Sequence, residues 1–168
     1  MSIQLHAQPY DTSAVGFCFD SIEDYAEKAA KLRNDYGDPV EEFEIQFIDG
    51  DGIDCALAKA IGLNQANLKQ FFDAVDAWDE DDKTRVILAV GECGYCFEDS
   101  TQPSDFDLDI YAFETMRELA EHFVDEGLFG DIPEQLQFYI DYDAIARDLR
   151  VDYAETTVAG IPLIYRCA

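Results

Sequence analysis

The chain has 168 residues, and its 37 Asp and Glu against 11 Lys and Arg give a formal net charge of -26. Because 48% of its residues are apolar and 13% are aromatic, the chain has enough apolar side chains to form a folded core. This excludes a disordered acidic chain. No apolar run reaches the roughly 18 residues of a membrane span, and the first residues lack the pattern of a signal peptide. Five scattered cysteines suit a reducing compartment, so we expect a cytoplasmic protein that binds no membrane.

The first fifty residues predict a small sheet with one helix. The stretch "SIEDYAEKAAKLRNDYGDP" begins with Ser21 as N-cap, repeats apolar residues at helical spacing, and stops at Gly37 and Pro39. The stretch "EEFEIQFI" alternates apolar and polar residues as a half-buried strand does, and "AVGFCF" before the helix is its candidate partner. We expect an N-terminal α+β module over residues 1–60.

The middle of the chain predicts helices. The stretch "NQANLKQFFDAVDAW" places its large apolar residues on one side of a helix. In "DEDDKTRVILAVGECGYC" the apolar run "VILAV" suits a strand or a buried helix, but the acids before it stabilise a helix N-terminus, which favours a helix. We expect a helical middle module over residues 61–104.

The last third predicts a second α+β module over residues 105–168. The stretch "FDLDIYA" alternates as a strand, and "TMRELAEHFVDEG" has the capping box Thr115 with Glu118. Two short helices follow around Pro133 to Leu149, and a terminal hairpin turns near Ala159 and Gly160. The fold class is therefore α+β, built from three small modules.

Catalytic, redox and metal interpretations find little support. The chain has two histidines and lacks G-x-S-x-G, P-loop, G-x-G-x-x-G and H-E-x-x-H motifs, so we expect no enzyme and no cofactor. Cys93 and Cys96 have redox spacing, but neighbouring acids raise a thiolate pKa, and we expect buried structural thiols. The stretch "DGDGID" begins like a calcium loop but lacks the required glycine and glutamate, so we expect no metal site.

Charge is the main clue to function. Spread evenly over a compact protein of this mass, 26 charges give roughly one per 320 Å², whereas duplex DNA carries about one per 110 Å². Residues 1–54 hold 13 acids, 55–104 hold 9 and 105–168 hold 15, so there is no separate acidic tail. To imitate nucleic acid, the acids must lie along one face or the molecule must be elongated. For any single pair of acids a solvated surface is the simpler interpretation.

The stretch "GDIPEQLQFYIDYDAIARDL", residues 130–149, closely resembles the antirestriction motif of the ArdA family. The matching features are the opening "GDIPE", the core "YIDY" and the close "ARDL". Similarity is looser over "VGFCFDSIEDY" and "EEFEIQFIDG", so the resemblance runs along the chain and is strongest in the last third.

The resemblance implies a non-catalytic inhibitor carried by mobile genetic elements. It implies an elongated, curved dimer of three-module subunits whose carboxylates imitate the phosphates of bent DNA. Such proteins occupy the DNA groove of type I restriction-modification enzymes, so the expected partner is their methyltransferase core rather than nucleic acid. The alternative is an acidic binding module for another basic DNA-binding protein, which charge alone does not separate from antirestriction.

Candidate residues fall into two groups. The candidate DNA-mimic acids are Glu23, Asp24, Glu27, Asp79, Glu80, Asp81, Asp82, Asp107, Asp109, Glu114, Glu118, Glu121, Asp125, Asp131, Glu134, Asp141, Asp143 and Asp148. The candidate dimer interface is the densest apolar cluster of the motif with its flanking arginines, namely Phe138, Tyr139, Ile140, Tyr142, Arg147 and Arg150. The alternative is that the motif's apolar residues are core, namely Ile132, Leu136, Tyr139, Ile140, Ile145 and Leu149.

Overall fold

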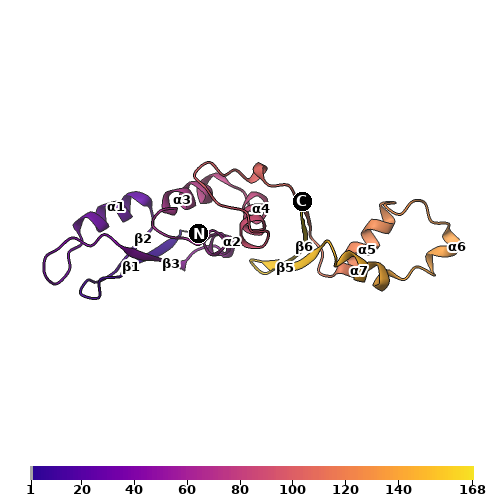
Figure 1. Ribbon diagram of the computed structural model, residues 1–168, viewed down its shortest axis with the longest axis horizontal. Coiled ribbons are helices and arrows are strands. Elements are labelled where there is room, and N and C mark those ends of the chain that lie inside the picture. The colour runs from indigo at the N-terminus through magenta and orange to yellow at the C-terminus, as the bar shows by residue number, and fades with distance from the viewer. Residues whose placement is uncertain (1) are drawn as a thin grey trace. The chain divides into compact units, whose positions relative to one another are not determined.

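The computed structural model describes residues 2–168 and divides after Phe106 into two compact units. We call them the N-terminal unit, which ends at Phe106, and the C-terminal unit, Asp107–Ala168. Each contains helices and a three-stranded antiparallel sheet (Figure 1). The predicted α+β class is confirmed, while the subdivision of the N-terminal unit between residues 60 and 61 stays a prediction.

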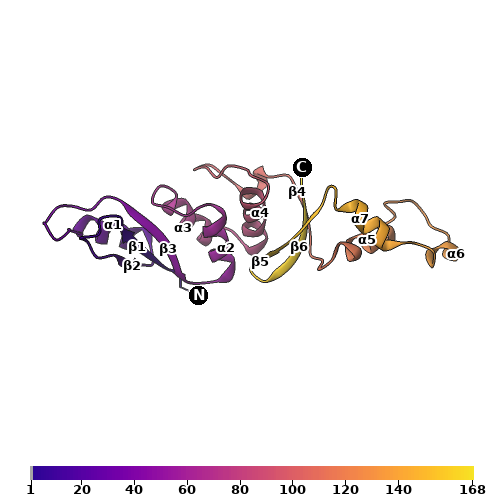
Figure 2. The same cartoon turned by 60° about the horizontal axis from the view of Figure 1, so that its bottom comes forward.

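The sheet of the N-terminal unit has the strand order β2-β1-β3 (Figure 2). Its strands are β1 (Gln4–Pro9), β2 (Phe17–Phe19) and β3 (Phe43–Asp49). Both strands predicted from sequence are present, but each pairs with β1 and not with the other, so the predicted partnership is wrong. The reason is that β1, which sequence reasoning missed, lies between them and buries Leu5 and Ala7.

Helix α1 (Ile22–Lys31) begins as predicted, with the Ser21 hydroxyl accepting a hydrogen bond from the Asp24 backbone N–H at 3.2 Å. It ends before the predicted Gly37 and Pro39. The chain turns early because the Asn34 side-chain oxygen accepts hydrogen bonds from two backbone N–H groups later in the turn, at 3.0 and 2.9 Å. Local side-chain bonding of this kind competes with helix propagation.

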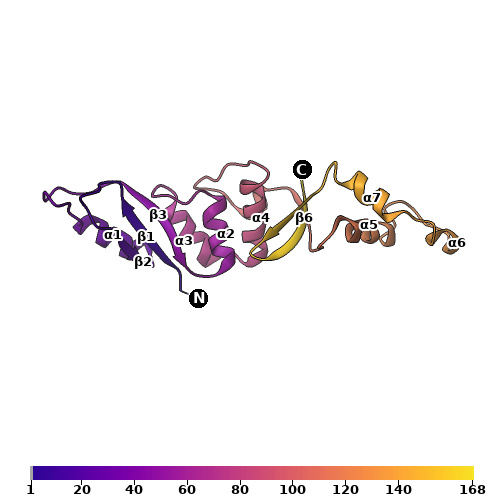
Figure 3. The same cartoon turned by 90° about the horizontal axis from the view of Figure 1, so that it is seen from below.

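Three further helices complete the N-terminal unit: α2 (Gly52–Ala60), α3 (Leu68–Ala77) and α4 (Glu80–Gly91). A short 3-10 turn, η1 (Pro103–Asp105), follows. The predicted helix at "VILAV" is confirmed as α4, which starts where the Asp79 carboxylate accepts a hydrogen bond from the Asp82 N–H at 2.8 Å. Helix α2, which sequence reasoning missed, lies beside α4 (Figure 3).

The sheet of the C-terminal unit has the strand order β4-β6-β5, with β4 (Leu108–Tyr111), β5 (Ala154–Val158) and β6 (Ile161–Cys167). The predicted terminal hairpin is confirmed, because β5 pairs antiparallel with β6. Its two turn residues are left-handed, with φ of 49° at Ala159 and 83° at Gly160. Such turns match the natural twist of the two strands.

Helices α5 (Met116–Asp125) and α7 (Tyr142–Leu149) pack on one another and form the core of the C-terminal unit. The buried residues of this core are Met116, Leu119, Ala120, Phe123, Ala146 and Ile164. The segment between the two helices carries the one-turn helix α6 (Glu134–Gln137) and lies at the end of the unit away from the strands (Figure 1). From residue 124 to residue 145 no described side chain is buried.

The prediction of buried thiols is wrong for both cysteines of this motif: Cys96 is a free, exposed cysteine, and Cys93 is half-buried and disulfide-bonded. The loop after α4 runs over the surface, so its side chains are not enclosed on all sides. Cys18 and Cys55 are also free and exposed.

Candidate partner-binding surface

Almost every carboxylate of this chain lies at the surface. Among the 37 Asp and Glu, all within the described residues, Asp54 is the single buried one. Charged groups are costly to bury unless they are paired, so an acid-rich chain must place its acids outside. The outcome is a surface with a large excess of negative charge over both units.

The buried Asp54 has a structural task. Its Oδ1 lies 2.7 Å from Nζ of Lys83, and the side chains are 4% and 9% exposed, so the pair links α2 to α4 within the core of the N-terminal unit. Lys83 is itself the only other buried charged residue in the described part of the chain. This acid therefore balances a buried cation and is not available to a partner.

The structure leaves all eighteen candidate DNA-mimic acids accessible. Four of them are half-buried, namely Asp24, Asp82, Asp109 and Glu121. The others are exposed, namely Glu23, Glu27, Asp79, Glu80, Asp81, Asp107, Glu114, Glu118, Asp125, Asp131, Glu134, Asp141, Asp143 and Asp148. None is buried, so each can face solvent or a partner.

The acids of α1 are paired within the helix. Asp24 lies 2.7 Å from Nζ of Lys28, and Glu27 lies 2.5 Å from Nζ of Lys31. The hydrogen bond from Lys31, together with its charge, holds the pKa of the Glu27 carboxyl below its usual range. Exposed pairs at this spacing contribute little stability, so a basic partner competes for these carboxylates at low cost.

The first turn of α4 carries the densest acid run, Asp79 to Asp82. Asp79 caps the helix, and the three following acids belong to its first turn. The partial positive charge at a helix N-terminus stabilises acids there, which offsets their mutual repulsion. Local structure therefore holds four carboxylates together on a short stretch of surface.

In the C-terminal unit, two arginines bring acids of different elements together. Arg117 of α5 contacts Glu121 at 3.0 Å and Asp143 of α7 at 2.8 Å. On the sheet, Nε of Arg166 donates a hydrogen bond to Asp109 at 2.8 Å across the β4–β6 pair. These acids are partly neutralised and resemble free phosphates less than the rest.

Two more candidate acids also cap helices. The Glu118 carboxylate accepts hydrogen bonds from the N–H groups of Glu114 and Thr115, at 2.8 and 3.0 Å, which confirms the predicted capping box. The Asp141 carboxylate accepts one from the Ala144 N–H at 3.0 Å at the start of α7. Structural and electrostatic roles therefore coincide at these positions.

The candidate interface residues are divided by the fold. Phe138 and Tyr139 are 93% and 84% exposed, whereas Tyr142 packs against the core with the Arg117 guanidinium 5.7 Å from its ring centroid. Ile140 is half-buried. The core interpretation is therefore wrong for Tyr139.

The flanking arginines are exposed, with Arg147 3.9 Å from Asp148 and Arg150 3.6 Å from Glu155. The core interpretation is wrong for Leu136, which is 54% exposed, while Ile132 is half-buried. It holds for two residues of α7 that pack against the core, Ile145 and Leu149.

Sequence reasoning missed two further exposed apolar residues of the segment between α5 and α7. Leu128 is 65% exposed and Phe129 is 54% exposed, in the turn that follows α5. We define the exposed apolar cluster as Leu128, Phe129, Leu136, Phe138 and Tyr139. A signal was present in the sequence, because large apolar residues just beyond the helix C-terminal Gly127 have no helical face on which to be buried.

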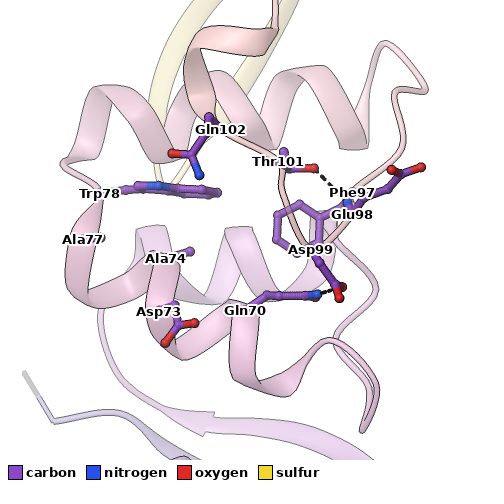
Figure 4. A pocket seen from close by; sticks show the side chains of 10 residues that line it. All are labelled: Gln70, Asp73, Ala74, Ala77, Trp78, Phe97, Glu98, Asp99, Thr101 and Gln102. Atoms are coloured by element: carbon purple, nitrogen blue, oxygen red, sulfur yellow. Dashed lines mark hydrogen bonds between the residues drawn. The ribbon is translucent and has the colours of Figure 1, made fainter.

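Sequence reasoning also missed a hollow in the N-terminal unit, which is lined by α3, its C-cap Trp78 and the loop that includes residues 97–102 (Figure 4). The rings of Trp78 and Phe97 meet edge-to-face, with centroids 6.4 Å apart. At the other end the Gln70 amide donates a hydrogen bond to Asp99.

Neither a metal centre nor a membrane span is found within residues 2–168. No group of three or more His, Cys, Asp and Glu side chains is arranged there to hold a metal ion. No helix in the same range combines the length and the apolar character needed to cross a bilayer.

The fold and surface together define an acidic α+β protein of two units, in which all carboxylates but one lie at the surface and an apolar cluster is exposed on the C-terminal unit. Residues 10–161 of the 168 match the family model described as Antirestriction protein (ArdA). The chain therefore belongs to the ArdA family, whose members are inhibitor proteins, and membership implies an antirestriction activity. No curated protein matches the chain.

Proposed function

We propose that this protein inhibits type I restriction-modification enzymes by imitating DNA. It occupies the DNA-binding groove of the methyltransferase core in the cytoplasm and so protects incoming mobile DNA from cleavage. The observation that carries the proposal is the surface location of every acid but one in a chain of the ArdA family. A groove that binds phosphates through Lys and Arg attracts such a surface by the same electrostatics.

The proposed binding depends on many weak contacts. Each exposed carboxylate contributes little alone, but together they replace a series of phosphates in the groove. The exposed acids without a cap or ion-pair partner among the described residues are the best phosphate mimics, and they include Glu23, Glu80, Asp107, Asp125 and Asp131. Salt screens such contacts beyond about 8 Å at 0.15 M, so affinity falls steeply as salt is added.

The proposed active form is a homodimer joined through the exposed apolar cluster. Exposed apolar residues gathered in one segment are typical of an interaction surface. Two subunits together carry twice the charge of -26, so self-association requires an apolar contact that offsets repulsion. Phe138 and Tyr139 offer the most exposed rings of the cluster, at 93% and 84%.

The dimer is tested by sedimentation of Phe138→Ser/Tyr139→Ser. We expect this variant to be a monomer at concentrations where the unmodified protein is a dimer. Tyr36→Ser is the matched control, because Tyr36 is 83% exposed in the N-terminal unit and lies outside the cluster. A dimer that survives the double substitution, or a monomeric unmodified protein, would contradict the proposed interface.

The function is tested by adding the purified protein to a type I enzyme and measuring ATP-dependent cleavage of a plasmid with its target site. We expect cleavage to stop near a stoichiometric amount of inhibitor at low salt. A type II endonuclease acting on the same plasmid is the control for unspecific effects of polyanions. Equal inhibition of both enzymes would favour a general acidic binder, and inhibition of neither would refute the proposal.

A further inference from the structure

We infer that the hollow beside Trp78 is an anchoring site for one arginine side chain of a basic protein partner. The inference rests on the proposed function, because it names a specific contact within an otherwise diffuse charged surface. It differs from phosphate imitation because the hollow is lined by aromatic and amide side chains as well as by carboxylates.

The size of the hollow suits a small group. Its volume is about 190 Å³, below the range of about 300–1,000 Å³ that is typical of sites for whole small molecules. A single long side chain, entering from a partner's surface, fits a hollow of this size. The hollow therefore suits a side chain rather than a free metabolite.

The lining selects a cation. The hollow is lined by carboxylates and amides, and none of its ten described lining residues is Lys, Arg or His. Of the three carboxylates, Asp73 is already paired with Nζ of Lys69 at 2.5 Å, which leaves Asp99 and Glu98 for a cation from a partner. The indole of Trp78 is half-buried and lies at one end of the hollow (Figure 4). Tryptophan is the aromatic side chain with the strongest attraction for a cation placed over its ring face.

The same lining favours arginine over lysine. A guanidinium is planar, so it stacks on an aromatic ring while its N–H groups donate to carboxylate and amide oxygens in its plane. An ammonium is a compact charge that gains less from a flat ring. The Gln70 side chain already holds the Asp99 carboxylate by a hydrogen bond, which fixes one acceptor in place before a partner arrives.

Trp78 allows a direct test, because it is the single tryptophan of the chain and its fluorescence reports on this hollow alone. The purified protein is titrated with the capped tripeptide Gly-Arg-Gly at constant ionic strength. Peptides with lysine or with neutral citrulline in place of arginine are the probes for comparison. We expect a saturable change with arginine, a weaker one with lysine, and none with citrulline.

The matched variants are Asp99→Asn and Asp35→Asn, which remove the same charge from the hollow and from an exposed loop of the same unit. We expect Asp99→Asn to lower the affinity for the arginine peptide about two- to fivefold. Asp35→Asn should leave this affinity nearly unchanged. Equal weakening by both variants, or no fluorescence change in the unmodified protein, would overturn the inference. Citrulline acting as well as arginine would overturn it too.

The result of the peptide titration and the result of the type I cleavage assay can be told apart. A protein that blocks type I cleavage but gives no arginine response refutes the anchoring site alone. A protein that responds to the arginine peptide but leaves type I cleavage unaffected refutes the proposed function and keeps the site.

Discussion

Breaking the buried ion pair of the N-terminal unit should destabilise the protein strongly. The substitution Lys83→Met keeps most of the apolar stem of Lys83 but removes its ammonium, which lies 2.7 Å from Asp54. Because the Asp54 side chain is 4% exposed, water cannot replace the lost partner. Removing one partner of a buried pair typically costs about 3–5 kcal/mol, a large part of a whole domain's stability.

The assay is urea unfolding followed by the fluorescence of Trp78, which directly precedes the N-cap of α4, the helix that carries Lys83. Lys59→Met is the matched control, since Lys59 is an exposed lysine of α2, and surface changes of this kind stay within about 0.5 kcal/mol. The double variant Asp54→Leu/Lys83→Met should recover most of the loss, because apolar replacement of both partners is often neutral. A loss below about 1 kcal/mol for Lys83→Met would refute the assigned role of this pair.

Three further outcomes follow from the structure. Ala159→Asn should raise stability by about 0.5–1 kcal/mol in thermal unfolding, because Asn tolerates the left-handed φ of 49° better than Ala does; a lower melting temperature would contradict this. Asp107→Asn and Asp125→Asn should each raise the half-inhibitory concentration against a type I enzyme less than about fivefold, whereas a hundredfold loss from either would indicate a discrete site. The dimer should weaken at low salt in sedimentation, because like charges meet there, and tighter association as salt is removed would refute the proposed interface.

Local signals in the sequence predicted the helices well. Ser21, Asp79 and Thr115 cap α1, α4 and α5 with bonds to N–H groups three residues on, so the cap and its partner lie in one short stretch. Helix α2 was missed because it opens with Gly52, and glycine is a poor helix former. Strand order was mispredicted because pairing joins residues far apart in the chain, such as His6 with Gln46.

The candidate surface also has features that the sequence predicts and features that it does not. That the acids lie outside follows from their number and from the cost of burying charge, so it could be expected from composition. The buried position of Asp54 could not be expected from composition, because Asp54 and Lys83 are 29 residues apart and meet only when α2 packs on α4. The hollow was hidden for the same reason, since Trp78 and Phe97 belong to a helix end and a distant loop.

The most direct test of DNA imitation is displacement of a fluorescent target duplex from a type I methyltransferase by this protein across a salt series. The account predicts competition: the concentration of protein needed for half-displacement increases linearly with the duplex concentration. It also predicts that affinity for the enzyme falls steeply and linearly on a plot of log affinity against log salt, as DNA affinity does. Binding of the protein to an enzyme that still holds its duplex, or an affinity independent of salt, would contradict the central claim.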